Sequence, residues 1–272
     1  MVVPDPLFTE LADGRLQPNG TARGPWSPHA LHGGPVAAAV ARAAEAALGS
    51  TGSEAVEPVR MTVDLERPVP LAPLRIDAEI VRAGRKVQVA AATVRDASEQ
   101  VLATARVLAT RRSSVDLPAD LIQPADERPP PVDAGHGEPA YRPDASLEYF
   151  HADGVEHRYV AGRFSRQGPA TDWIRLAVPV VAGEEPSPFQ RTVAAADFCN
   201  GISSVLPWDR WSFINPDLTV SLHRTPVGPW ICVDATSRLD PSGVGTAEAD
   251  LFDERGRVGR AVQTLIVQPI ER

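Results

Sequence analysis

Apolar and polar residues alternate along several short stretches of the chain, and Ile76, Ala78 and Ile80 separated by charged residues are one example. This two-residue period is typical of strands that cover a core with one face. It predicts strands over residues 59–66, 74–82, 87–95, 101–110, 148–150, 158–164, 173–181, 213–223, 230–239, 245–252 and 258–267. Matching hairpin turns are expected at residues 96–99 and 253–256.

Two segments lack this alternation and predict helices. The first runs from Pro35 to Leu48, consists mainly of Ala and Val, and is followed by Gly49. Proline suits the first position of a helix, and glycine suits the residue after its end. The second predicted helix runs roughly from Phe189 to Val205. Because alanine allows backbones to approach closely, a curved sheet can wrap tightly around the first helix.

The predicted helices and strands follow the same order in the two halves of the chain, and part of the sequence recurs. Residues 62–67 are repeated as residues 219–224, an offset of 157, and the strand at 101–108 is repeated at 258–265 with the same offset. In that register Arg106 is the counterpart of Gln263. A guanidinium group has no hydrogen-bond acceptor, so the first copy is not expected to duplicate a site built on Gln263. A duplicated fold with one working site is therefore predicted.

The stretch between the two copies is rich in proline. Residues 113–146 contain seven prolines, including the triplet Pro129–Pro131, and show no apolar period. Such composition is typical of a semi-rigid extended connection. We expect an N-terminal unit at 1–112, a linker at 113–146 and a C-terminal unit at 147–272.

One helix followed by a long antiparallel sheet in each half predicts an α+β fold, a double hotdog in which two tandem units each wrap a curved sheet around a central helix. The chain resembles the double-hotdog acyl-CoA thioesterases, meaning the type II bacterial and peroxisomal group and their thioesterase-like relatives. The segments that carry this resemblance are 32–34, 66–70, 195–198, 213–217, 222–224 and 261–263. The resemblance implies hydrolysis of a fatty acyl-CoA without a cofactor.

Asp197 and Gln263 are the leading candidates for catalysis. Asp197 lies within the second predicted helix between apolar residues, where a partly desolvated carboxylate is a better base. Gln263 lies in a predicted buried strand, where its amide must be hydrogen-bonded. From pattern alone, Asp197 facing solvent is an equal alternative, and Gln263 binding a neighbouring backbone group is the favoured one. The resemblance implies that Asp197 activates a water and that Gln263 helps to hold it.

The third water-orienting residue differs from the pattern of the family. The resembling enzymes carry Thr or Ser where this chain has Asn215, whose amide or carbonyl can also bind a water. Thr219, two positions beyond Asp217 on the same predicted strand face, is the fallback.

The segment His32-Gly33-Gly34 is the candidate for the oxyanion and substrate contacts. Backbone N–H groups at a helix start favour negative charge, and glycine lets a carbonyl approach. Glycines needed only for close helix–sheet packing are an equal alternative. Arg82, Arg85 or Arg112 would contact the coenzyme A phosphates.

Composition narrows the class of protein. The 272 residues carry a net charge of −8 with 43% hydrophobic and 23% charged residues, which argues against binding to nucleic acid or insertion into a membrane. No cofactor and no metal site are expected, because no His, Cys or Asp cluster has ligand spacing. Cys199 and Cys232 are expected to be buried free thiols in the cytoplasm. Aromatic residues make up 6%, so an acyl tunnel lined mainly by Val, Leu and Ala is expected.

Other functions remain open at this point. Within enzymes they are a hotdog dehydratase or hydratase, or a tailoring thioesterase acting on carrier proteins. A different class is a non-catalytic acyl-CoA-binding protein. A homo-oligomer is expected, because hotdog sheets pair through edge strands.

Overall fold

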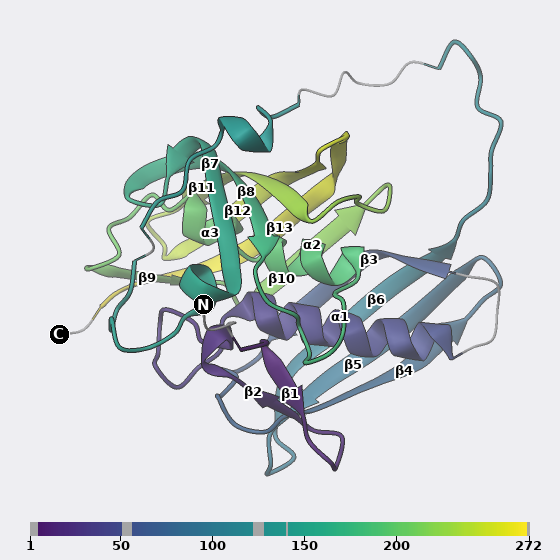
Figure 1. Ribbon diagram of the computed structural model, residues 1–272, viewed down its shortest axis with the longest axis horizontal. Helices are drawn as coiled ribbons and strands as arrows, with labels where there is room; N and C mark the ends of the chain where they lie inside the picture. The colour runs from purple at the N-terminus through teal and green to yellow at the C-terminus, as the bar shows by residue number, and fades with distance from the viewer. Residues whose placement is uncertain (1–4, 51–55, 122–127, 140, 271–272) are drawn as a thin grey trace.

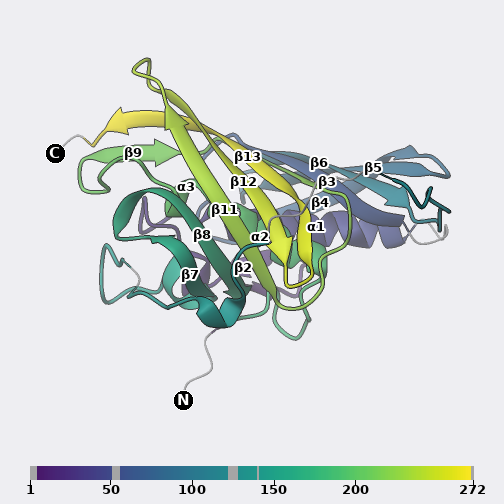
Figure 2. The same cartoon turned by 90° about the horizontal axis from the view of Figure 1, so that it is seen from above.

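The computed structural model describes residues 5–50, 56–121, 128–139 and 141–270. These residues form an eleven-stranded antiparallel sheet with the main helices on one side of it (Figures 1 and 2). The first half contains β1 (Phe8–Glu10), β2 (Leu16–Pro18), η1 (Gly20–Ala22), α1 (Gly33–Gly49), β3 (Val56–Leu65), β4 (Arg75–Ala83), β5 (Val87–Arg95) and β6 (Val101–Arg111). The second contains η2 (Val132–Ala134), η3 (Phe150–Gly154), β7 (Val155–Arg163), β8 (Arg166–Leu176), α2 (Pro188–Ala196), α3 (Cys199–Ile202), β9 (Trp211–Ile214), β10 (Asp217–Leu222), β11 (Trp230–Leu239), β12 (Val244–Asp253) and β13 (Gly256–Pro269).

The two halves are joined edge to edge through β3 and β10. The strand order is β4-β5-β6-β3-β10-β13-β12-β11-β8-β7, with β9 pairing on β13. Thr62 and Thr219, separated by the repeat offset, are direct partners across this junction, and their hydroxyl oxygens lie 3.1 Å apart. The duplication is therefore arranged about a pseudo-twofold axis at this pair. This is the double hotdog fold, as predicted.

The predicted offset of 157 between the two copies is wrong by one residue for β6 and β13, the strands that pair with β3 and β10. Thr62 pairs with Arg106, whereas Thr219 pairs with Val262. The structural counterpart of the buried Gln263 is therefore the buried Val107, and Arg106 is exposed. Since valine has no polar side-chain atom, the first copy still lacks an equivalent of Gln263.

The helix α1 is confirmed, and it packs closely on α2. His32 caps its start by accepting a hydrogen bond from the Gly34 N–H at Nδ1, 3.1 Å away. A Cβ at Gly34 would lie 2.8 Å from the Ala194 carbonyl oxygen, so only glycine allows this approach of the two helices. The main hydrophobic core runs through both halves, and a smaller cluster surrounds Trp173, Cys232 and Phe252.

The second predicted helix is interrupted. Instead of one helix to Val205, α2 ends at Ala196 and α3 begins at Cys199. The break is stabilised by Gln263, whose Nε2 donates to the Asp197 carbonyl oxygen at 3.2 Å and whose Oε1 accepts from the Asn200 N–H at 3.1 Å. A side chain on a distant strand thus satisfies backbone groups that a continuous helix would have paired.

Three strand predictions also differ from the structure. Residues 150–154 form one π-helical turn, η3, rather than part of a strand at 148–150. The strand predicted at 213–223 is divided into β9 and β10, which flank Asn215 and Pro216. Proline has no N–H to donate to a ladder, so pairing is interrupted there. The strand predicted at 173–181 belongs to β8, which starts earlier and ends at Leu176.

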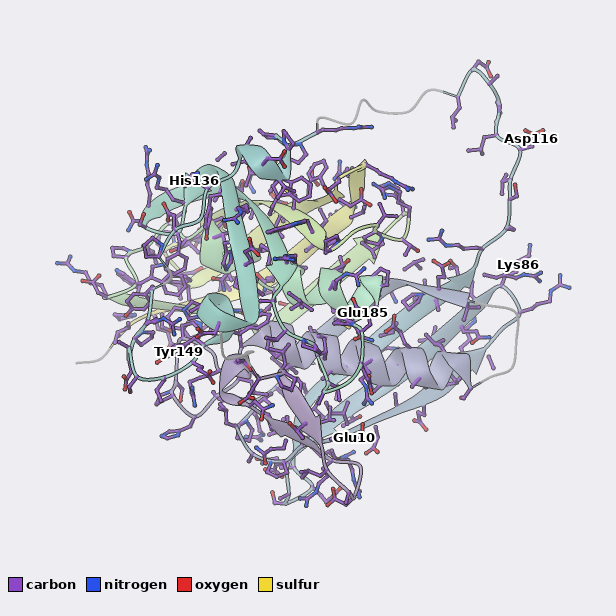
Figure 3. All side chains as sticks on the ribbon, viewed as in Figure 1. Glu10, Lys86, Asp116, His136, Tyr149 and Glu185 are labelled. Atoms are coloured by element: carbon purple, nitrogen blue, oxygen red, sulfur yellow. The ribbon has the colours of Figure 1, made fainter. Side chains whose placement is uncertain are left out.

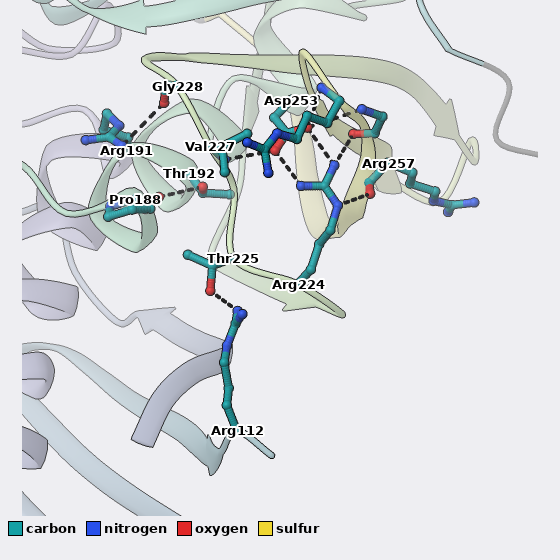
Figure 4. Close-up of polar contacts among 12 residues, drawn as sticks. Arg112, Pro188, Arg191, Thr192, Arg224, Thr225, Val227, Gly228, Asp253 and Arg257 are labelled. Atoms are coloured by element: carbon teal, nitrogen blue, oxygen red, sulfur yellow. Dashed lines mark hydrogen bonds and ion pairs between the residues drawn. The ribbon is translucent and has the colours of Figure 1, made fainter. Parts of the chain in front are cut away.

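The predicted hairpin turns at residues 96–99 and 253–256 are confirmed. Asp253 is buried in the second turn and accepts hydrogen bonds from the Arg224 guanidinium group and the backbone N–H groups of Val227 and Arg255 (Figure 4). Opposite this turn, Arg112 at the end of the first half donates to Thr225 of the second. The β3–β10 junction has one end close to Asn215. These contacts stabilise its other end.

After β6, residues 112–121 lead away from the sheet, as Figure 3 shows near Asp116. The later part of the linker packs on the second half, where the Trp173 indole N–H donates to the Pro130 carbonyl oxygen at 2.9 Å. The division at residues 112 and 146 remains a prediction, since one sheet and one core run through both halves. Among the described residues, no helix has the length and apolar character that crossing a membrane requires.

Candidate active site

Asp197 follows the last residue of α2 and is 5% exposed. Its Oδ1 accepts hydrogen bonds from Gln263 Nε2 at 3.0 Å and from Asn215 Nδ2 at 2.9 Å. Its Oδ2 lies 2.8 Å from His32 Nδ1. Three of the predicted residues therefore converge on one buried carboxyl group, from a helix end, the last strand and the β9–β10 break.

Gln263 is fully buried, and both ends of its amide are occupied. Besides bonding Asp197, it bridges the interruption between α2 and α3. The alternative that Gln263 simply satisfies backbone groups is thus partly correct. The same side chain orients the carboxylate and fixes the turn that carries it.

Asn215 uses its side-chain N–H groups on Asp197 and on the Asp217 carbonyl oxygen, 3.3 Å away. Its side-chain oxygen has no hydrogen-bond partner among the described residues. Because Asn215 lines the adjacent cavity, that oxygen is available to accept a hydrogen bond from a water there.

Thr219 lies elsewhere. Its hydroxyl pairs with Thr62 at the junction of the two halves, and it does not line the cavity. Among the described residues, the structure brings Asn215 rather than Thr219 to the carboxylate.

His32 and Gly33 form the opposite wall. A Cβ at Gly33 would lie 2.7 Å from Asp197 Oδ2, so glycine is required for the start of α1 to approach the carboxyl group. The N–H of this first residue has no intrahelical partner and adds to the positive end of the helix dipole. His32 Nδ1 donates to Asp197 when protonated, or accepts from Gly34 when not.

A cavity of about 490 Å³ opens beside this carboxylate and is lined by both halves. Its volume is in the usual range for small-molecule sites. The expected lining of Val, Leu and Ala is wrong in part, because Trp26 and Trp208 also form its wall. Their rings stack at 4.9 Å. Overall aromatic content could not reveal that these two distant residues meet.

The arginines suggested for coenzyme A do not line this cavity. Arg82 and Arg85 are exposed near Lys86, which Figure 3 labels at the turn between β4 and β5. Arg112 forms an ion pair with Glu57. Arg67 is instead exposed at the cavity, and its guanidinium group has no ion-pair partner among the described residues.

Two groups of buried and partly buried polar residues were not found by sequence reasoning. Glu45 on α1 accepts hydrogen bonds from the Ser187 hydroxyl at 2.7 Å and Gln190 Nε2 at 2.7 Å, and burial raises the pKa of its carboxyl group. Behind Phe198, His157 Nδ1 lies 2.5 Å from Asp172, whose pKa burial also raises. Neither pair is close in sequence, so no local signal marked them.

Two family profiles match this chain. The family profile described as the acyl-CoA thioesterase N-terminal domain matches residues 22–111, and that of the C-terminal domain matches residues 124–267. A search of curated proteins found no match.

Solved structures share the fold. A provisionally assigned thioesterase II from Thermobifida fusca YX is 18% identical, with a TM-score of 0.72 and 97% of each chain covered. A provisionally assigned thioesterase from Novosphingobium aromaticivorans DSM 12444 is 19% identical, with a TM-score of 0.68 over 97% of this chain and 99% of that one. An acyl-CoA thioesterase II from Mycobacterium marinum is 13% identical, with a TM-score of 0.62 over 88% and 91%. The chain belongs to the acyl-CoA thioesterase family defined by these two domains.

Proposed function

We propose that this protein hydrolyses the thioester of an acyl-CoA by general-base activation of water at Asp197. The observation that carries the proposal is the buried Asp197 carboxylate, held by Gln263 and Asn215 at the wall of a cavity large enough for an acyl group. The acyl-CoA part rests on the family, and the mechanism rests on the geometry of these side chains.

In this mechanism a water bound by Asp197 and the free oxygen of Asn215 attacks the thioester carbonyl carbon. Asp197 takes one proton from the water as the carbon–oxygen bond forms. The negative charge that develops on the carbonyl oxygen faces the start of α1, where the Gly33 N–H and the helix dipole stabilise it. Collapse of the tetrahedral intermediate breaks the carbon–sulfur bond, and the leaving thiolate receives the proton. The products are free coenzyme A and a carboxylic acid, which ionises to the carboxylate by releasing its proton to the solvent.

The test is thiol release from acyl-CoAs of two to sixteen carbons. The native protein should release coenzyme A from part of this series, and Asp197→Asn should lower kcat by about 10²–10⁴-fold while leaving binding intact. Glu45→Gln is the matched control, because Glu45 is a partly buried helix carboxylate that lies away from this cavity.

Each contrary result has a clear meaning. Acyl-CoA binding without thiol release across the series would favour a binding protein. Equal rates for Asp197→Asn and the native protein would exclude Asp197 as the base. Release only from carrier-protein thioesters would assign the tailoring alternative.

A further inference from the structure

A second cavity lies behind the wall of the first. It has a volume of about 220 Å³, and its lining includes Tyr141, Phe164, Ile202, Ser204 and Trp208. Trp208 also lines the cavity beside Asp197. One side chain therefore belongs to the walls of both spaces.

The same segment of backbone passes from one cavity to the other. Asn200 and Gly201 line the first cavity, and Ile202 and Ser204 line the second. These residues lie along α3 and the turn after it, so the two cavities adjoin along this segment and at Trp208.

Aromatic packing alone holds the Trp208 ring in this position. Its ring centroid lies 4.9 Å from that of Trp26, 5.2 Å from that of Phe164 and 4.5 Å from that of Phe213. Its indole N–H is buried and has no hydrogen-bond partner among the described residues. A buried donor without a partner destabilises its position, so the ring lacks the directional bond that usually fixes a buried tryptophan.

We propose that Trp208 is the partition that limits the length of the acyl chain, and that the second cavity receives the far end of a longer chain when the ring is removed. The inference rests on the proposed function, since it assigns the first cavity to the acyl group. Phe164 and Ile202 give the second cavity the apolar surface that a hydrocarbon end requires.

The test compares hexanoyl-CoA with palmitoyl-CoA. Trp208→Ala should raise the ratio of kcat/KM for palmitoyl-CoA to that for hexanoyl-CoA by more than about tenfold, because each newly buried methylene contributes about fourfold in affinity. Trp208→Phe, which keeps a smaller ring in place, should shift the ratio less and in the same direction. It also serves as the test if the alanine variant does not fold.

Trp230→Ala is the matched control. Trp230 is partly buried on β11 and lines neither cavity, so its loss should leave the ratio unchanged. An unchanged ratio in both Trp208 variants, or a shift toward hexanoyl-CoA, would overturn the proposal.

Affinity measurements distinguish a failure of the Trp208 partition from a failure of the proposed hydrolysis. In the Asp197→Asn background, adding Trp208→Ala should increase affinity for palmitoyl-CoA more than for hexanoyl-CoA. If the native protein released no thiol but this affinity shift appeared, hydrolysis would be rejected and the partition retained. Active native protein without the affinity shift would reject the partition only.

Discussion

Glu45 and Asp197 are carboxylates at opposite ends of the α1–α2 helix pair, and each faces the first residues of the other helix. Asp197 contacts Gly33, while Glu45 accepts a hydrogen bond from Ser187, the cap of α2. The two ends differ in their backbone donors, because α2 begins with Pro188, which has no N–H. The pseudosymmetric pair therefore offers a backbone N–H donor at the first helical position beside Asp197 but not at the equivalent position beside Glu45.

Asn215, and not Thr219, should be the third residue of the site. Asn215→Ala removes a hydrogen bond to a carboxylate, a type of bond worth about 1.5–3 kcal/mol, and should lower kcat by about 10- to 100-fold. Thr219→Val should leave kcat unchanged and cost about 1 kcal/mol of stability, since it leaves Thr62 unpaired. Steady-state kinetics and urea unfolding of both variants check this, and the reverse pattern of kcat values would reassign the role to Thr219.

Gly33 should be required for the position of the base. In Gly33→Ala the new methyl group would overlap the Asp197 carboxylate, and a displacement of about 1 Å can cost about 10²-fold in rate. Gly49→Ala at the other end of α1 is the control, because its Cβ would meet no atom within 4 Å. Kinetics and circular dichroism should show a folded, impaired Gly33→Ala and an unimpaired Gly49→Ala. Full activity of Gly33→Ala would contradict this account.

His151 should make the fold sensitive to acid. Burial lowers the pKa of His151 from 6.5 to about 4. Between these values the unfolded chain binds a proton that the folded protein does not, so stability is present above pH 6.5 and is lost as pH falls toward 4. The shift corresponds to a loss on the order of 3 kcal/mol.

Urea unfolding at pH 7, 5.5 and 4.5 measures this loss. His151→Phe should reduce the loss of unfolding free energy between pH 7 and pH 4.5. His223→Gln, at an exposed histidine, should not reduce it. The raised pKa of Glu45 acts in the opposite sense, since its stabilising effect is present at low pH and is lost as pH rises. If His151→Phe lost as much unfolding free energy at low pH as the native protein, this histidine would be ruled out as the cause of the loss.

Cys199 and Cys232 should be unreactive in the folded protein. Both thiols are buried, and burial raises the pKa of each well above its usual value, which suppresses the nucleophilic thiolate. Ellman's reagent should label neither cysteine in the native state and both in guanidinium chloride. Because Cys199 begins α3, rapid native labelling at that thiol would mean that the α2–α3 break opens in solution.

Much of the strand pattern followed from the two-residue period, and β5 and β11 have the predicted bounds. The failures occur where a distant residue decides the local structure. The helix break after Ala196 depends on Gln263, sixty-six positions away from Asp197. Pro216 was a local signal for the division between β9 and β10. No local signal indicated that this division turns Asn215 toward Asp197.

The sequence alone determined the duplication and most of the strand and helix types, because periodicity is a local property, whereas Asp197 and Gln263 were singled out by the resemblance to a family. Only the tertiary structure decided which counterpart Gln263 has, that Asn215 rather than Thr219 reaches the acid, and that two tryptophans wall the cavity. These depend on strand register and on contacts between residues far apart in the chain. A one-residue change of register moves a side chain to the other face of the sheet, and no local pattern fixes it across a duplication.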